Sequence, residues 1–311
     1  MTATTRVPAT ARIVIAAPMK SGSTFVANAV RRILRAPDFE LEYDWLSEQN
    51  LTYELREQLR NKRFAINLHI LPHTSNLAAA AAESITLIPL WRNLADMVVS
   101  YEDHIPRYGA HNPIFYAPEN LMEIDQHARH RYLIDGLVPW NLGFYLRWRD
   151  LGACFQSYET LAVDPHGYLR YLLWRLGVAY THDDVLRALQ RDDRDSSRFN
   201  SGTIGRSARL LDADNRARVE RHIVDHPRFD ELEVLLWELP WTPTQIERRS
   251  LFDGCTVRAS DDVDAQVHFV SRGVRHRVSY EWLMQRPPTL AAPQRISAAA
   301  LAALPEGIAL V

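Results

Sequence analysis

A short polar segment near the start of the chain, APMKSGSTF, combines residue types that bind an anion. Lys20 supplies a mobile positive charge, Gly22 lets the backbone approach a ligand closely, and Ser23 and Thr24 carry hydroxyl groups that donate hydrogen bonds. The segment joins an apolar run to a helical pattern, so successive backbone N–H groups and a helix N-terminus would point at one spot. The pattern favours a phosphate or sulfate site. The same residues would also serve as a helix cap beside a solvated lysine.

A second segment, LWRNLADMVVSYEDH, places Arg92 at the end of an apolar strand and Ser100 eight residues later on the following helix. A guanidinium forms charge-assisted, forked hydrogen bonds with a terminal phosphate. An arginine is therefore a suitable residue type for binding a terminal phosphate.

Together, PMKSGSTF and WRNLADMVVSY resemble the two nucleotide-binding signatures of sulfotransferases that use 3′-phosphoadenosine 5′-phosphosulfate (PAPS) as donor and give 3′-phosphoadenosine 5′-phosphate (PAP) as product. The resemblance implies that the first loop holds the 5′-phosphosulfate and that Arg92 and Ser100 contact the 3′-phosphate. Two positions depart from the family pattern. Leu94 stands where proline is common, and Phe25 stands where tryptophan is common beneath the adenine.

Two further segments resemble the same family more loosely. SYETLAVDP is similar to a strand end whose tyrosine, here Tyr158, approaches the adenine, and FNSGTIGRSARLL is similar to a late glycine-rich loop over the 3′-phosphate. The family usually has Arg or Lys directly before the first glycine of that loop, whereas this chain has Asn200 and Ser201 there. The resemblance covers about residues 12–234 and implies these donor-binding residues: Lys20, Ser21, Gly22, Ser23, Thr24, Phe25, Arg92, Ser100, Tyr158, Arg198, Ser201, Gly202 and Arg206.

The resemblance also implies which residues carry out the reaction. Sulfuryl transfer passes an anionic group in line between two oxygens, so positioning and charge stabilisation do most of the catalysis and no metal is expected. Lys20 is the candidate for stabilising the leaving oxygen. In INLHILP, His69 stands at the position of the catalytic base of cytosolic members, and Asn67 replaces a lysine that is often present there. The implied catalytic residues are Lys20, His69 and Ser100, with His73, His104 and Glu102 as rival bases.

The acceptor pocket is expected to involve the long aromatic segment SYEDHIPRYGAHNPIFYAPEN. Its candidate substrate residues are Glu102, His104, Tyr108, His111, Phe115 and Tyr116. A surface loop anchored by aromatic side chains would show the same pattern. The aromatic cluster within residues 140–148 fits either the pocket or core packing. The acceptor itself stays open among small molecules, lipids and glycans.

The elements that must position these residues follow an α/β pattern. Apolar strand-like runs at 13–17, 64–68, 85–91 and 153–158 are each followed by helical segments, which predicts a mostly parallel sheet flanked by helices with a P-loop-like phosphosulfate-binding loop. Helices are predicted at 25–34, 78–83, 119–133, 140–148, 168–176 and 212–224. Ligands of such sheets bind beyond the carboxyl ends of the strands.

The pattern changes after WELPWTPTQ, where short β-like stretches at 255–259, 267–271 and 274–279 are separated by turn residues. We therefore expect a catalytic domain over residues 1–245 and a small C-terminal α+β module over 246–311. The module carries a basic strand. It would bind an anionic polymer, pack on the catalytic domain or mediate a homodimer, and packing is favoured.

Composition and charge narrow the class of protein. The 311 residues include 36 Lys and Arg against 38 Asp and Glu, for a net charge of −2, so we expect no general affinity for nucleic acid. No window reaches the length of a membrane span and no signal pattern opens the chain, which favours a cytoplasmic protein. Cys154 and Cys255 lack metal-ligand spacing and are expected to be buried reduced thiols.

Two rival functions remain at this point. A small-molecule kinase would use the first loop for ATP, but a Walker A motif has Lys after its second glycine, whereas Lys20 precedes the only glycine of the loop. A non-catalytic adaptor would keep the nucleotide-binding fold and bind glycans through the C-terminal module.

Overall fold

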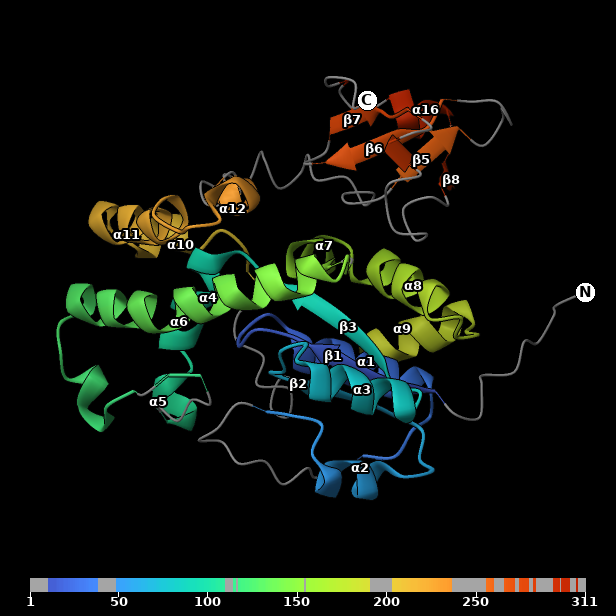
Figure 1. Ribbon diagram of the computed structural model, residues 1–311, viewed down its shortest axis with the longest axis horizontal. Coiled ribbons are helices and arrows are strands. Elements are labelled where there is room, and N and C mark those ends of the chain that lie inside the picture. Colours follow the sequence, from blue (N-terminus) through green and yellow to red (C-terminus); the bar gives the residue numbers. More distant parts are fainter. Residues whose placement is uncertain are drawn as a thin grey trace, which may run out of the picture. The chain divides into compact units, whose positions relative to one another are not determined.

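The computed structural model describes residues 11–38, 49–109, 114–115, 117–153, 155–190, 203–236, 256–259, 266–271, 274–279, 282–283, 293–296, 298–302 and 306. The chain divides into two compact units, Met1–Pro240 and Trp241–Val311. Each unit has its own sheet (Figure 1). Within the described ranges, no helix is long and apolar enough to cross a membrane.

The first unit is built on a parallel four-stranded sheet, which confirms the predicted α/β class. Its strands are β1 (Arg12–Ala16), β2 (Phe64–Leu68), β3 (Thr86–Trp91) and β4 (Gln156–Ser157), in the order β2-β1-β3-β4. The pairs β1–β2, β1–β3 and β3–β4 are all parallel. The first three strands are mostly apolar because helices cover both faces of the sheet.

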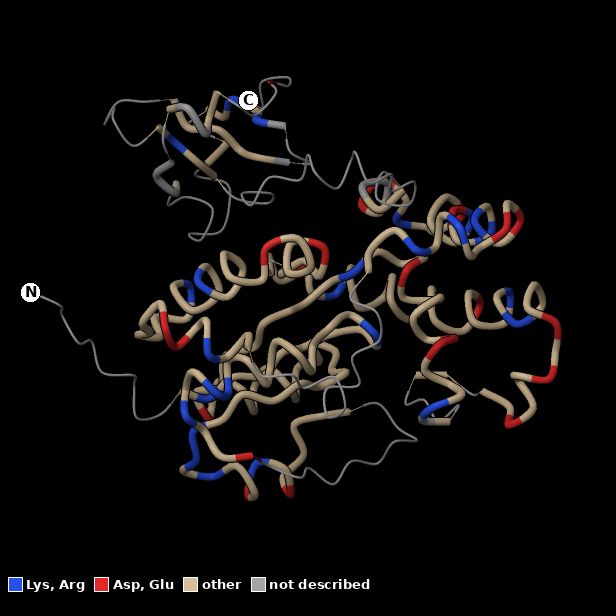
Figure 2. The backbone as a smooth tube through the Cα atoms, turned by 180° about the vertical axis from the view of Figure 1, so that it is seen from behind, with Lys and Arg blue, Asp and Glu red and all other residues tan. Residues whose placement is uncertain are grey.

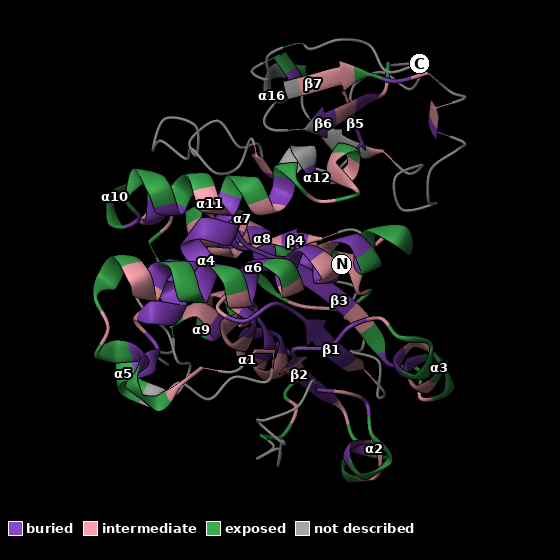
Figure 3. Cartoon of the chain, turned by 60° about the vertical axis from the view of Figure 1, so that its left-hand side comes forward, coloured by how far each residue is buried: buried purple, intermediate pink, exposed green. Residues whose placement is uncertain are grey.

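Side chains of β1 alternate between two hydrophobic clusters, one on each face of the sheet. Ile13 and Ile15 belong to a cluster with α1 (Ser23–Ile33), α7 (Tyr158–Val163), α8 (Pro165–Arg175) and α9 (His182–Gln190). Val14 and Ala16 belong to the other cluster, which includes α4 (Leu94–Glu102), α6 (Gln126–Asp150), α11 (Ala213–Val224) and α12 (Phe229–Leu236). This alternation is the two-residue period of a β-strand. Figure 3 shows the buried strands between helices with exposed outer faces.

Shorter helices complete the first unit. They are α2 (Tyr53–Leu59), α3 (Thr74–Ala82), α5 (Ile105–Tyr108), the 3₁₀ turn η1 (Glu119–Met122) and α10 (Ser207–Leu210). Charged residues of both signs lie along the helices and their connections, and few lie along the central strands (Figure 2). Buried polar side chains near the carboxyl edge of the sheet therefore stand out from the apolar strands, and they are candidates for a functional role.

Two predictions about elements were wrong in detail. The helices expected at 119–133 and 140–148 are a short 3₁₀ turn followed by one helix, α6, that continues through Pro139. The Asp125 side chain accepts the Ala128 N–H and so starts α6 there, and buried neighbours of Pro139, such as Val138 and Leu142, hold the helix together across the missing N–H. The strand expected at 153–158 is limited to two residues, because Tyr158 begins α7 after the Ser157 cap.

The second unit holds β5 (Thr256–Ala259), β6 (His268–Ser271), β7 (Val274–Arg277), β8 (Gln294–Ile296) and α16 (Ala298–Ala302). The sheet order is β7-β6-β5-β8, with β6 antiparallel to both β5 and β7 and with β8 parallel to β5. Its described core consists of Val257, Val270 and Leu301 with Ala259 packed against them. The predicted β-rich module is present, and β8 is a strand that the sequence did not indicate.

Candidate active site

The carboxyl ends of three neighbouring strands bring the first predicted site residues together. β2, β1 and β3 are adjacent and parallel, so the segments that follow them, beginning at His69, Ala17 and Arg92, leave the same edge of the sheet. The Ala17 N–H donates to the Leu68 carbonyl at 3.0 Å, which continues the β1–β2 pairing into this edge. The predicted base, the predicted loop and the predicted phosphate-binding arginine therefore border one region.

The loop before α1 has an unusual backbone. Lys20 has φ 65° and Gly22 has φ 82°, so two of three successive residues are in the left-handed region. A Cβ atom at residue 22 would lie 2.5 Å from Cδ2 of Tyr158, and only glycine fits this close approach. The buried Ser21 hydroxyl donates to the Pro18 carbonyl at 2.7 Å, so this side chain ties the loop to itself.

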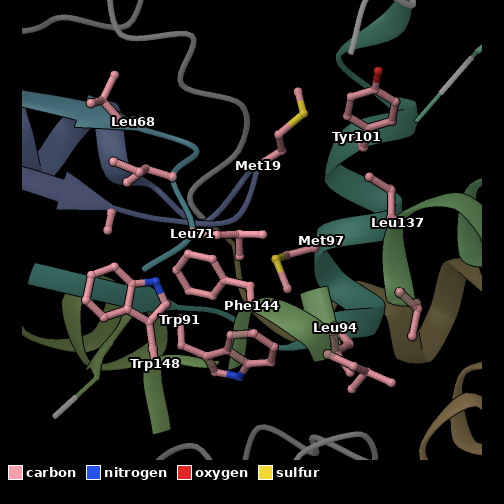
Figure 4. Packing of buried hydrophobic residues seen from close by; sticks show 14 of the residues in the cluster. Met19, Leu68, Leu71, Trp91, Leu94, Met97, Tyr101, Leu137, Phe144 and Trp148 are labelled. Atoms are coloured by element: carbon pink, nitrogen blue, oxygen red, sulfur yellow. The ribbon is translucent and has the colours of Figure 1, made fainter. Parts of the chain in front are cut away.

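The loop is anchored on both sides of the sheet. Met19 lies in the core cluster with Leu71 and Met97, as Figure 4 shows, while Ser23 is buried at the start of α1. Thr24 is half-buried, and Phe25 is half-buried against the other cluster. The strained turn thus keeps a fixed shape between two packed residues, which is what a preorganised anion site needs.

Arg92 is a buried cation in contact with this loop. Its side chain is 5% exposed, Nη1 donates to the Lys20 carbonyl at 2.8 Å, and Nη2 reaches the Thr203 carbonyl at 3.5 Å. Its Cζ atom lies 4.2 Å from the centroid of the Tyr158 ring, and burial raises the pKa of the Tyr158 phenol. Among the described residues, the buried Nε of Arg92 has no hydrogen-bond partner. The guanidinium therefore keeps one donor for a ligand.

The Lys20 side chain contacts the short connection between α4 and α5. Its Nζ lies 3.4 Å from Nδ1 of His104, a buried residue directly before α5. The predicted leaving-group residue and a predicted acceptor-side residue are thus in contact. The segment after α4 borders the loop at this point.

Glu102, the last residue of α4, contacts two side chains of α6. Its Oε1 accepts from Nε of Arg129 at 2.7 Å, and its Oε2 accepts from Nε2 of the buried His130 at 2.8 Å. Burial raises the pKa of this carboxyl, but the hydrogen bonds from His130 and Arg129 outweigh it, so the pKa is lowered. Glu102 is consequently a carboxylate with two strong donors, which disfavours it as a general base.

His69 has one fixed ring nitrogen. Its Nδ1 lies 2.8 Å from the Ala17 carbonyl, and its backbone N–H donates to Oε1 of Gln49 at 2.7 Å. A carbonyl only accepts, so Nδ1 must carry the proton and Nε2 of the neutral ring carries the lone pair. This tautomer is the one that a general base requires.

Ser100 lies buried on α4. The Asn93 side chain caps α4, and the Asn93 N–H donates to Oε1 of Glu159 at 2.8 Å. Arg206 forms an ion pair with Asp103, with Nη1 2.6 Å from Oδ2. The resemblance implied a phosphate contact for Arg206, which here contacts a carboxylate.

The other predicted residues are spread more widely. Phe115 packs against Gly136 of α6 and lies 5.8 Å from Tyr101, centroid to centroid, and Tyr108 is the last residue of α5. The following predicted positions lie outside the described residues: His111, Tyr116, Cys154, Arg198, Ser201, Gly202 and Cys255.

Sequence reasoning missed three buried polar residues at this edge of the sheet. Asp96 accepts two backbone N–H groups, Glu159 holds the start of α4, and Gln49 holds the backbone of His69. The signal for Asp96 was a carboxylate inside an otherwise apolar run, since such a group must find donors when it is buried. Across the described ranges, no group of three or more His, Cys, Asp or Glu side chains could hold a metal ion.

Among known proteins, this chain resembles solved structures only. No protein-family model and no curated protein matches the sequence. A crystal structure of mouse sulfotransferase SULT7A1 complexed with PAP is 17% identical, with a TM-score of 0.49, and the match covers 73% of this chain and 88% of that one. Retinol dehydratase in complex with androsterone and the inactive cofactor PAP is 16% identical, with a TM-score of 0.45 and coverage of 69% and 80%. Retinol dehydratase in a complex with retinol and PAP is 16% identical, with a TM-score of 0.42, and the match covers 71% of this chain and 81% of that one.

Proposed function

We propose that the first unit is a sulfotransferase that moves a sulfuryl group from PAPS to a hydroxyl or amine of an acceptor. The observation that carries this proposal is the buried Arg92 guanidinium against the strained loop, with an Nε donor that has no partner in the described part of the chain. Arg92 forms no ion pair there either. Burying an uncompensated charge is costly, so an anionic ligand is the counter-ion that this site lacks.

The residues present fit the donor. The loop of Lys20, Ser21, Gly22, Ser23 and Thr24 holds the 5′-phosphosulfate, whose sulfur carries the group to be transferred. Arg92 and Ser100 hold the 3′-phosphate together with the late loop, and Phe25 and Tyr158 flank the adenine. Support for this placement is the Gly22–Tyr158 approach and the cation–π contact between Arg92 and Tyr158, which bring the two signatures and the tyrosine together. The late-loop contacts proposed from the resemblance are Arg198, Ser201, Gly202 and Arg206.

Lys20 and His69 divide the chemistry between them. Lys20 stabilises the electron pair that remains on the phosphate oxygen when the old S–O bond breaks. His69 accepts at Nε2 the proton that the acceptor hydroxyl loses as the new S–O bond forms. The Nδ1 contact with Ala17 supports this role, because it holds the ring in the tautomer with a basic Nε2. Asn67, half-buried on β2, supplies a neutral amide where a second charge is common in the family.

The acceptor approaches from the side of the segment that follows α4. The contact of Lys20 with His104 supports this direction, since it connects that segment with the loop. Small molecules, lipids and glycans are the acceptor classes that we propose. We also propose that the protein acts in the cytoplasm.

Ligand-dependent thermal stability tests the donor assignment, because a ligand that binds only the native state raises the melting temperature. PAP without metal should raise it more than ATP with magnesium does. A preference for ATP would favour the kinase instead, and PAP binding without sulfate transfer to any acceptor would favour the adaptor.

Two arginine variants make that measurement specific. Arg92→Lys keeps the charge but loses the planar fork, so it should weaken PAP binding by about tenfold or more. Arg187→Lys, on the exposed side of α9, should leave PAP binding unchanged. Equal PAP affinity in both variants would contradict the role of Arg92.

A further inference from the structure

Two carboxylates, that of Asp96 in α4 and that of Asp103 directly after it, hold the segment 203–207, and neither takes part in the transfer chemistry proposed above. Asp96 is 2% exposed, and its Oδ2 accepts the Gly205 N–H at 2.6 Å while its Oδ1 accepts the Ser207 N–H at 2.9 Å. At the other end of the helix, Asp103 accepts from Arg206. Both contacts fall within three consecutive residues of the segment.

The two carboxylates share one face of the helix with Ser100. Asp96, Ser100 and Asp103 follow one another at intervals of four and three residues, the spacing that places side chains on the same face of an α-helix. The segment 203–207 therefore runs along the face that carries Ser100. Arg92 reaches the same segment, because its Nη2 contacts the Thr203 carbonyl.

The Asp96 contact is the most costly of these ties to break. A buried carboxylate that accepts two backbone N–H groups forms charge-assisted hydrogen bonds, and a buried partner left unsatisfied pays its full desolvation cost. The Asp103–Arg206 pair is more exposed, at 32% and 17% of the two side chains, so water screens it. Asp96 therefore determines where the segment lies more than Asp103 does.

We propose that Asp96 is a positioning residue that fixes the segment 203–207 beside Arg92 and Ser100 and thereby encloses the 3′-phosphate of the nucleotide. This inference rests on the proposed function of the site. Asp96 does not attract the phosphate, since the two charges have the same sign. Its lone pairs are directed at the backbone of the segment, and the segment completes the site.

The sign of the effect separates positioning from direct electrostatics. Asp96→Asn removes a negative charge and one of the two acceptor atoms while it keeps the shape of the side chain. Simple charge repulsion predicts tighter phosphate binding in this variant. Positioning predicts the opposite, with PAP binding weakened by about tenfold or more and adenosine 5′-phosphate, which lacks the 3′-phosphate, changed by less than about twofold.

Two further variants complete the comparison. Asp164→Asn is the matched control, because Asp164 also accepts a backbone N–H, that of Gly167 at 2.8 Å, but caps α8 instead. It should leave the preference for PAP over adenosine 5′-phosphate intact. Asp103→Asn changes the more exposed of the two contacts and keeps the test available if Asp96→Asn fails to fold. It should lower the same preference by a smaller factor.

Hydrogen exchange in the nucleotide-free protein directly measures whether Asp96 protects the Gly205 and Ser207 N–H groups. The amides of Gly205 and Ser207 should exchange about tenfold faster or more in Asp96→Asn and at the wild-type rate in Asp164→Asn. Unchanged exchange, or an unchanged preference for PAP, overturns the positioning role while the proposed function stands. A wild-type protein that binds PAP no better than adenosine 5′-phosphate overturns the proposed function and the enclosure with it, whereas the exchange rates still report whether Asp96 holds the segment.

Discussion

At the scale of single residues, Lys20 is the group on which the transfer step should depend most. Removing one preorganised charge at a developing oxyanion costs about 10²-fold or more in rate, so Lys20→Ala should lower kcat by that factor. The measurement is steady-state transfer of labelled sulfate together with PAP affinity, which should fall much less than kcat. Lys62→Ala, an exposed position after α2, is the control. Unchanged turnover in Lys20→Ala would refute its assignment.

His69 should affect transfer without affecting the nucleotide. If His69 takes the acceptor proton as proposed, His69→Ala should keep its affinity for PAP and lose about 10²-fold or more in transfer to an aliphatic alcohol. Since the base must be neutral, wild-type kcat/KM should rise with pH as the imidazole loses its proton, and that limb should be absent in the variant. His73→Ala tests the rival base. If transfer is slowed in His73→Ala and unchanged in His69→Ala, the base is His73.

Residue types in the sequence indicated several of the candidate site residues but not the contacts between them. The two signatures singled out Lys20 and Arg92, and in the structure Nη1 of Arg92 donates to the Lys20 carbonyl. The Lys20–His104 contact had no signal in the sequence, because it joins residues that are 84 positions apart. Tertiary contacts of this kind are set by the whole fold.

At the scale of elements, the packing of α4 against α6 depends on a buried ion pair. Glu102 of α4 holds Arg129 and His130 of α6, and its side chain is 10% exposed. Glu102→Gln should destabilise the protein by about 1–3 kcal/mol, because it leaves Arg129 and His130 without their carboxylate. The exposed variant Glu57→Gln, which breaks a surface pair with Arg60, should cost less than about 1 kcal/mol. Urea unfolding of the two variants measures the difference.

The same pair gives a pH dependence with a definite sign. The pKa of Glu102 is lowered from the model-compound value of 4.5, since hydrogen bonds from His130 and Arg129 outweigh the burial that raises it. A lowered folded-state pKa contributes stability above that value and loses it as the pH falls through the folded-state pKa. Wild-type stability should thus drop more steeply below about pH 4.5 than that of Glu102→Gln. Parallel curves for the two proteins would contradict this account.

Elements with a strong local pattern were predicted well, and elements that depend on context were not. β2 matches its predicted bounds and β1 and β3 differ from theirs by one residue, because each is a buried apolar run between turns. Where two helices were expected, α6 continues through Pro139, because the surrounding core holds it together. The capping aspartate at 125 was a usable signal for the true start of that helix.

At the scale of the whole molecule, the sequence predicted a catalytic domain and a small module, and the chain divides at Pro240. The alternative that the module binds an anionic polymer loses support from its ion pairs. Glu306 contacts Arg277 at 2.7 Å and Arg275 at 3.5 Å, so part of the positive charge of β7 is neutralised within the unit. The sequence of β7 alone could not show these ion pairs, because Glu306 lies about thirty residues after that strand.

The two units should therefore separate in function. Every described residue of the candidate active site lies in the first unit, which has its own parallel sheet and two large clusters, whereas the described core of the second unit holds Val257, Val270 and Leu301. A chain of residues 1–240 should fold, as judged by a cooperative thermal transition. It should bind PAP within about twofold of the full chain, because every proposed donor contact lies within residues 20–206. Calorimetric titration of both chains measures this. If the shorter chain folds but binds PAP about tenfold more weakly or worse, the second unit contributes to the site, and if it does not fold, the first unit depends on the second for its stability.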